Sequence, residues 1–196
     1  MDSDQVKFRA VFIYSKGSKR QLLLSYKEIE NLTTFIRNTI KQEVTIINTN
    51  MGLDIYYLSS VDMRDFICKA FGLFHAIHGS SEHNFKIISL ESSLEIKQYL
   101  YHAYLHWVKM PLLLTSYIKS FVIQLTRDYM NNIKINALLF SVWYKNLQQV
   151  RLQKRGLVNQ KGELLIQTLR DLYLDHNYNP LEKNFILKAL SAEHHN

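Results

Sequence analysis

The chain has 196 residues, 47% of them hydrophobic and 21% charged, with a single cysteine and a formal net charge of +7 at pH 7. This composition excludes an intrinsically disordered chain, because it supplies enough apolar surface for a continuous core. The most apolar helical run, Pro111–Leu125, is interrupted by Lys119 and is shorter than the roughly 20 apolar residues that a membrane span requires. The lone cysteine and the polar start of the chain predict an intracellular protein, cytoplasmic or nuclear, with no transmembrane segment.

The chain begins with a predicted β-hairpin that is followed by a helix. Val6–Tyr14 is rich in β-branched and aromatic residues, and the polar segment SKGSK separates it from a second short apolar run, Gln21–Leu24. Ser25 and Glu28 then have the spacing of a capping box, and apolar residues recur at helical spacing to about Lys41. If no other strand covers this hairpin, we expect it to form an exposed edge of the sheet.

A second hairpin and a second helix follow in the same order. Val44–Ile47 and Ile55–Leu58 have the composition of strands, and the turn between them ends in a glycine. A second capped helix follows, which Gly79 is expected to close. Phe85–Leu90 is a candidate fifth strand.

From Ser93 onward the hydrophobic period changes to 3.6 residues, which indicates helices alone. The sequence therefore predicts an α+β fold, with an N-terminal portion of hairpins and helices over residues 1–92 and a basic helical bundle portion over 93–196. These portions form either two domains or one continuous domain. The predicted helices of the second portion are about Leu94–Val108, Leu112–Asn131, Ile133–Lys154, Glu163–Leu174 and Leu181–Ala192.

The positive charge is concentrated in these central helices. Between Ile96 and Gly162 there are ten basic residues and one acid, Asp128, so this segment carries +9 and the remainder of the chain −2. Lysines and arginines on a rigid helix face can neutralise a row of phosphates. Candidate nucleic-acid-binding residues on the helix that begins at Ile133 are Lys134, Lys145, Arg151, Lys154 and Arg155, with Trp143 and Tyr144 as groups that could stack on bases.

No motif for nucleotide hydrolysis, dinucleotide binding or nucleophilic catalysis occurs in the chain, so we predict a protein that is not an enzyme and has no cofactor. His102 and His106 are four residues apart on a predicted helix, and Cys68, His75, His78 and His83 form a looser cluster. Neither set has the usual spacing of a zinc site, so no metal is predicted.

Near the C-terminal end, Arg170 and His176 in RDLYLDH are separated by five residues. This spacing is similar to the R-x(4–6)-H element of HEPN-type ribonucleases, in which an arginine and a histidine act on the RNA backbone. The resemblance covers seven residues and does not extend over the chain. It implies a ribonuclease that would use Arg170 and His176, with two copies meeting across a dimer.

The leading hypothesis is a non-catalytic binding or assembly protein that engages RNA or single-stranded DNA through the basic helical face. The alternative is a structural or adaptor protein that acts through protein–protein contacts or self-assembly, and a small helical ribonuclease is the third reading. An anionic membrane surface or an acidic protein would also complement the same charges. A homo-oligomer is compatible with each of these hypotheses.

Overall fold

A computed structural model of the chain describes residues 5–16, 23–76, 85–107, 109–128, 131–153, 167–168, 170–171, 173–175 and 178–192. The strands are β1 (Lys7–Ser15), β2 (Val44–Thr49), β3 (Gly52–Ser59) and β4 (Phe85–Leu90). The helices are α1 (Tyr26–Ile40), α2 (Arg64–Ala76), α3 (Ser93–Trp107), α4 (Pro111–Asp128), α5 (Ile133–Gln153) and α7 (Pro180–Ala192).

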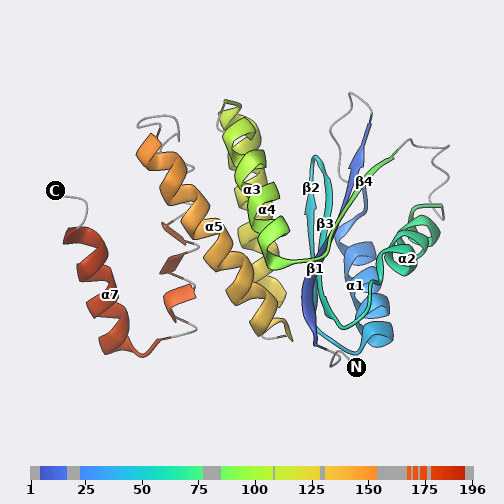
Figure 1. Cartoon of the computed structure of the whole chain (residues 1–196), viewed down its shortest axis with the longest axis horizontal. Coiled ribbons are helices and arrows are strands. Elements are labelled where there is room, and N and C mark those ends of the chain that lie inside the picture. Colours follow the sequence, from blue (N-terminus) through green and yellow to red (C-terminus); the bar gives the residue numbers. More distant parts are fainter. Residues whose placement is uncertain are drawn as a thin grey trace.

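The strands form one antiparallel sheet in the order β2-β3-β1-β4, so β1 is central and β2 and β4 are the edges. Figure 1 shows α1 and α2 on one face of the sheet and α3, α4 and α5 on the other, with α7 at the end of the molecule beyond α5. This arrangement confirms the predicted α+β fold, with the strands in the N-terminal part and helices after them.

Each face of the sheet buries its own core, because side chains alternate between the faces along a strand. On β1, Val11 and Ile13 face α1 and α2, whereas Ala10 and Phe12 face α3, α4 and α5. The core on the α3–α5 side joins strand residues to residues of all three helices, so the sheet and the later helices share one hydrophobic core.

The capping box, the second hairpin and the strand after it are confirmed. The Ser25 hydroxyl caps α1 and the Glu28 carboxylate bonds back to the Ser25 N–H, as the capping box predicts. β2 and β3 form the predicted second hairpin. Gly52 closes its turn with a φ of 152°, and an added Cβ would lie 2.1 Å from the Ile13 carbonyl oxygen, so only glycine fits there. Phe85–Leu90 forms a strand, as expected.

The first predicted hairpin is wrong. β1 pairs with β3 on one side and β4 on the other, so no edge remains for Gln21–Leu24. Leu23 and Leu24 lie in a bend before α1, and the Leu24 carbonyl accepts a hydrogen bond from Asn48. Gln21 and Leu22 lie outside the described residues. The expectation that this hairpin is an exposed edge is wrong for the same reason, since β1 is central.

The predicted helices after Ser93 are confirmed for α3, α4, α5 and α7, with boundaries that differ by at most a few residues. Of the predicted helix Glu163–Leu174, the structure describes 167–168, 170–171 and 173–174, and these residues are helical. Gly79, which was expected to close the second helix, lies outside the described residues. Within the described part of the chain, none of the helices has the length and apolar character needed to cross a membrane.

Candidate functional site

The residues predicted to bind nucleic acid begin on α5, but only part of the set can be placed. Lys134 lies in the first turn of α5 and is exposed. Lys154 and Arg155 lie outside the described residues. α5 also carries Tyr144, Lys145 and Arg151, whose side chains are outside the described set.

Trp143 is a core residue, which corrects the prediction that it stacks on bases. Its side chain is fully buried, and its ring centroid lies 4.1 Å from that of Tyr104 and 4.6 Å from that of Phe121. Tyr117 stacks on the indole at 5.2 Å with an interplanar angle of 19°. An indole held inside this aromatic cluster is not available to a base at the surface.

Apart from Glu95 in the first turn of α3, the described charged side chains of α3, α4 and α5 are basic. Among the described side chains between Ile96 and Trp143, all the lysines and arginines are exposed and none of the residues is acidic. The cations are Lys97, Lys109, Lys119, Arg127 and Lys134. The opposite layer differs, because α1 and α2 carry acids and bases together.

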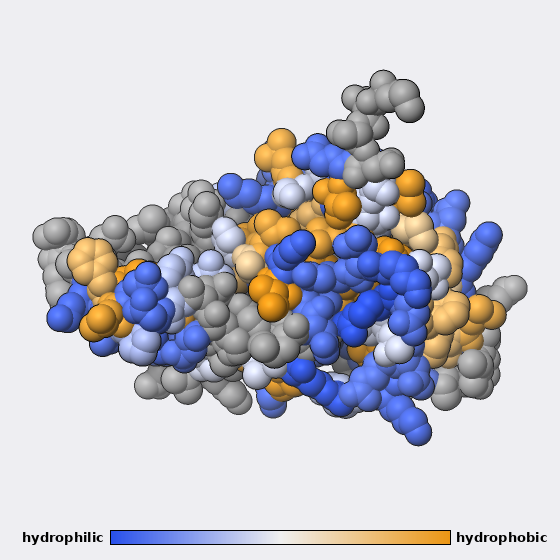
Figure 2. Space-filling model, turned by 90° about the horizontal axis from the view of Figure 1, so that it is seen from below, coloured by the Kyte–Doolittle hydropathy of each residue, from blue (hydrophilic) through white to orange (hydrophobic). Residues whose placement is uncertain are grey.

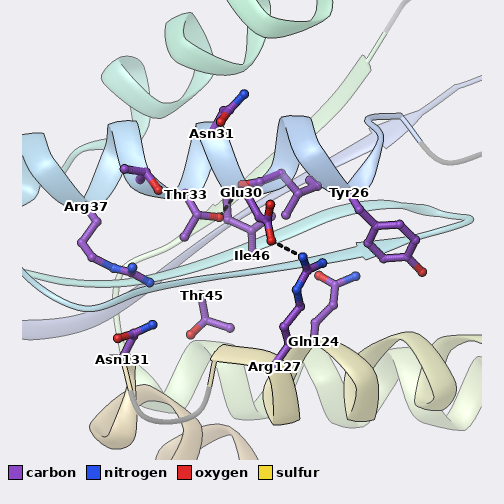
Figure 3. Close-up of a pocket in the computed structure, with 12 residues that line it drawn as sticks. Tyr26, Glu30, Asn31, Thr33, Arg37, Thr45, Ile46, Gln124, Arg127 and Asn131 are labelled. Carbon is purple, nitrogen blue, oxygen red and sulfur yellow. Dashed lines mark hydrogen bonds and ion pairs between the residues drawn. The ribbon is translucent and has the colours of Figure 1, made fainter.

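A polar groove runs along the edge of the sheet between α1 and α4 (Figure 3). We call it the β2-edge groove. Its volume of about 490 Å³ lies within the range of sites that bind small molecules. α1 lines it with residues between Tyr26 and Arg37, β2 with Thr45 and Ile46, and α4 with Gln124 and Arg127, while Asn131 follows α4.

Side-chain amides occupy most of the outer edge of β2 beside this groove. In the antiparallel register, the N–H and C=O groups of Val44, Ile46 and Asn48 point away from β3. Asn48 donates its N–H to Gln124 Oε1 at 2.8 Å and accepts from Gln124 Nε2 at 2.9 Å. Val44 donates its N–H to Asn132 Oδ1 at 3.0 Å. These bonds protect a strand edge that would otherwise be open to pairing with another chain.

Ile46 is the exception on this edge. It lies between the two protected positions and lines the groove. No described side chain hydrogen-bonds to its edge-facing N–H and C=O. Ile46 is 4% exposed, and its edge-facing N–H and C=O are one backbone donor beside one backbone acceptor on this side of the strand.

Two arginines lie on opposite parts of the groove, as Figure 3 shows. Arg37 donates to the Val44 carbonyl at 3.3 Å and to Asn132 Oδ1 at 3.4 Å, which fixes its guanidinium at the inner end. Arg127 reaches across from α4 to Glu30 on α1, and both partners of this ion pair are about half exposed. The Arg127 guanidinium also lies 6.0 Å from the centre of the Tyr26 ring.

A second polar cluster is buried between the sheet and the α3–α5 layer. Asp54 on β3 is fully buried and accepts hydrogen bonds from the hydroxyls of Tyr14, at 3.2 Å, and Tyr117. Tyr99 in turn donates to the Tyr14 hydroxyl at 3.3 Å. Burial raises the pKa of Asp54 to about 7, although the two tyrosine hydrogen bonds oppose this rise.

Asp54, Tyr117 and Tyr104 in this cluster are all completely buried. Tyr104 Oη and Trp143 Nε1 are also buried without a hydrogen-bond partner in the described part of the chain. We therefore expect this network to affect how stability depends on pH, and we do not treat it as a ligand site.

The other chemical candidates do not assemble into a site among the described residues. His102 and His106 are exposed on α3, and no group of three His, Cys, Asp or Glu residues with metal-binding geometry is found there. Burial raises the pKa of the half-buried Cys68 thiol. Arg170 donates two hydrogen bonds to the adjacent Asp171 at 3.0 Å. His78, His83 and His176 lie outside the described residues.

α7 presents an apolar face to solvent. Leu181 and Phe185 are four residues apart and therefore lie on one side of the helix, with 82% and 75% of their surfaces exposed. Figure 2 shows apolar side chains beside charged ones at the end of the molecule that α7 forms.

Sequence reasoning missed the groove because its residues are individually ordinary. Gln124 and Asn132 are separated from their β2 partners by 76 and 88 positions, and nothing local marks them as edge-protecting residues. Asp54 did leave a signal, since it is a lone acid within an otherwise apolar strand. The basic segment was found because charge can be counted without knowing the fold.

Comparison with known proteins gave no relative for this chain. No protein-family model, curated protein or solved structure matches it. Its function is therefore argued from the geometry and charge described above.

Proposed function

We propose that this protein is a non-catalytic binding protein that engages single-stranded nucleic acid, RNA or DNA, through the basic outer surface of α3, α4 and α5. The observation that supports this proposal is the separation of charge between the two helical layers. The described charges between Ile96 and Trp143 are all basic and exposed, whereas the α1–α2 layer is mixed.

Cations on packed helices suit this role physically. α3, α4 and α5 are fixed by the shared core beneath them, so the backbone positions from which their lysines and arginines extend are set before binding. Each phosphate contact releases counterions from the strand, which makes the affinity fall as salt is raised. Lys145 and Arg151 on α5, and Lys154 and Arg155 after it in the sequence, extend the same proposal.

The experiment is fluorescence anisotropy of labelled single-stranded RNA and DNA, each about twelve nucleotides long, titrated with protein over a salt series. We expect the logarithm of the association constant to fall linearly with the logarithm of the salt concentration. Each phosphate contact should contribute about 0.7 to the slope. Reversing Arg151 and Arg155 to glutamate should weaken binding to every sequence and reduce the slope. If these reversals leave the affinity unchanged, Arg151 and Arg155 are removed from the proposal. If the wild-type protein does not bind at low salt, the proposal is refuted.

A structural role through self-association is the second candidate, and the exposed apolar face of α7 is the observation that favours it. Two copies could bury Leu181 and Phe185 against each other across a two-fold axis. Light scattering should then show a dimer that Leu181→Glu converts to a monomer. A wild-type protein that is monomeric at high concentration would exclude this role.

A further inference from the structure

The β2-edge groove can accept only a limited kind of partner at the edge of the sheet. A peptide that extends the sheet must pair with successive edge-facing positions of the strand. Gln124 and Asn132 already occupy the positions on either side of Ile46. The groove therefore suits a ligand that needs one donor and one acceptor side by side, and the edges of nucleobases carry such pairs.

The opening of the groove carries an aromatic ring and a cation. Tyr26 is 51% exposed, so its ring is available to stack on a flat ligand. Arg127 lies beside this ring and is held by an ion pair with Glu30 at the surface. Exposed ion pairs contribute little to stability, so a phosphate can replace the Glu30 carboxylate as the partner of Arg127.

From these contacts, and resting on the proposed function above, we infer that the β2-edge groove holds one nucleotide of the bound single strand. The base stacks on Tyr26 and pairs its edge with the N–H and C=O of Ile46, while Arg127 binds the adjacent phosphate. The groove lies beside the C-terminal part of α4, and the exposed Lys119 lies about two turns before Arg127 on the same helix, so we expect the strand to continue from the groove along the basic surface of the helical layer.

Glu30 is expected to oppose the binding of a nucleotide in the groove. It is the acidic residue that lines the groove, and its carboxylate competes with a phosphate for Arg127. Removing its charge should strengthen binding of a nucleotide strand. Removing Arg127 should weaken it. Because Arg127 is also one cation of the basic surface, its removal weakens binding even if the groove has no role, so the base-dependent effect of Tyr26 decides whether the groove holds a nucleotide.

The first experiment compares an ordinary single-stranded DNA of about twelve nucleotides with an abasic strand of the same length, which keeps the phosphates and lacks the bases. We expect Tyr26→Ala to weaken binding of the ordinary strand about tenfold, because base–aromatic stacking is lost, and to leave binding of the abasic strand unchanged. Tyr26→Phe keeps the ring and should bind like the wild type. Tyr178→Ala, a change to a partly exposed tyrosine that precedes α7, is the matched control.

The second experiment measures the ordinary strand with variants at the ion pair. Glu30→Gln should tighten binding about threefold and Arg127→Ala should weaken it about tenfold, as expected for one charge-assisted phosphate contact. Asp65→Asn and Arg64→Ala make the same charge changes on the exposed surface of α2, away from the groove, and each should change binding less than its groove counterpart.

The outcomes separate the groove from the proposed function. If the wild type binds, reversal of Lys119 and Lys134 weakens binding, and Tyr26→Ala has no effect, nucleic-acid binding stands and the groove is overturned as a nucleotide site. Equal losses by Tyr26→Ala on the ordinary and abasic strands would also overturn it, because the ring would then not act on bases. A short polyglutamate peptide that displaces the strand and loses affinity in Tyr26→Ala would assign the groove to acidic proteins instead. No binding by the wild type defeats both proposals.

Discussion

α1 and α2 cover one face of the sheet with an apolar core, whereas α3, α4 and α5 bury the carboxyl group of Asp54 and several tyrosine hydroxyls against the other face. A buried carboxyl group costs free energy even when hydrogen bonds compensate part of it. The α1–α2 side also buries the side chains of Arg9 and Asn48, so polar groups are buried on both faces, and the α3–α5 side is distinguished by its buried carboxyl group and its linked tyrosine hydroxyls. The gain from burying apolar surface therefore does not explain why Asp54 and its tyrosine partners are found in this core.

The outer surfaces of the two layers differ in the sign of their charges. The described charges of α1 and α2 have both signs, and those of the α3–α5 layer from Ile96 to Trp143 are all basic. The β2-edge groove lies where the layers meet, with Glu30 from one and Arg127 from the other across its opening. We propose that the first layer has a structural role, that the second binds phosphates, and that the groove between them recognises a base.

The largest expected effect concerns the aromatic core of the α3–α5 layer. Trp143→Ala should lower the free energy of unfolding by about 3–5 kcal/mol, because it leaves a large cavity among Tyr104, Tyr117 and Phe121. Urea denaturation measures this loss. Phe185→Ala removes a ring that is 75% exposed and should change stability by less than about 0.5 kcal/mol. If Trp143→Ala loses nucleic-acid binding but keeps its stability, Trp143 is a surface binding residue and not a core residue.

The next largest effect is a pH dependence of stability that comes from Asp54 in the core on the α3–α5 side. Asp54 has a pKa of about 7 in the folded protein and an ordinary value of 3.8. The folded state therefore retains a proton between these values that the unfolded chain has released. This contribution to stability is complete below about pH 4, declines as pH rises through the folded pKa near 7, and can reach about 4 kcal/mol.

Urea denaturation from about pH 4.5 to pH 8.5 measures the decline. Asp54→Asn should flatten it, because the titrating group is gone, while Asp65→Asn on the exposed surface of α2 should keep the wild-type slope. A wild-type slope in Asp54→Asn would show that Asp54 does not control the pH dependence.

An intermediate effect is expected where the layers meet. Gln124→Ala leaves the edge-facing N–H and C=O of Asn48 without their partners, which should cost about 1–3 kcal/mol. Light scattering should also show a greater tendency to aggregate, since the edge of β2 is then less protected. Gln98→Ala, on the exposed surface of α3, is the control. Equal stability of the two variants would mean that the amide does not hold the strand edge.

The smallest effect should be the same in both layers. Ser25 caps α1 and the Ser92 hydroxyl accepts from the Glu95 N–H at the start of α3. Ser25→Ala and Ser92→Ala should each cost about 1 kcal/mol by thermal or urea unfolding. Equal losses would show that the layers form their helices in the same way and differ in core and surface. A loss several times larger in one layer would contradict that view.

The features that sequence could predict depend on residues close to one another in the chain. The cap at Ser25 involves Glu28, three positions away, and the β2–β3 turn joins neighbouring strands. The hairpin assigned to Gln21–Leu24 failed because the neighbours of β1 are chosen by long-range packing. Val11 pairs with Ile55 and Ser89, and no local pattern distinguishes these partners from a nearby apolar run.

The candidate site shows the same limit. The excess of basic residues is a property of composition and was predicted. Burial of Trp143 depends on three helices meeting the sheet, and an indole has the same appearance in sequence whether it packs inside or stacks outside. The groove depends on α4 and the start of α5 lying beside β2, which no periodicity in the sequence specifies.

The most direct test of the central claim compares two charge reversals of equal size. Lys119→Glu with Lys134→Glu changes the α3–α5 layer, and Arg64→Glu with Lys69→Glu changes α2 by the same charge; all four side chains are exposed. Anisotropy of a labelled single-stranded RNA should show a clear loss of affinity and a salt slope lower by about 1.4 for the first variant, with a much smaller change for the second. Equal losses in both variants would contradict the claim, because the protein would then bind through its net charge and not through one layer.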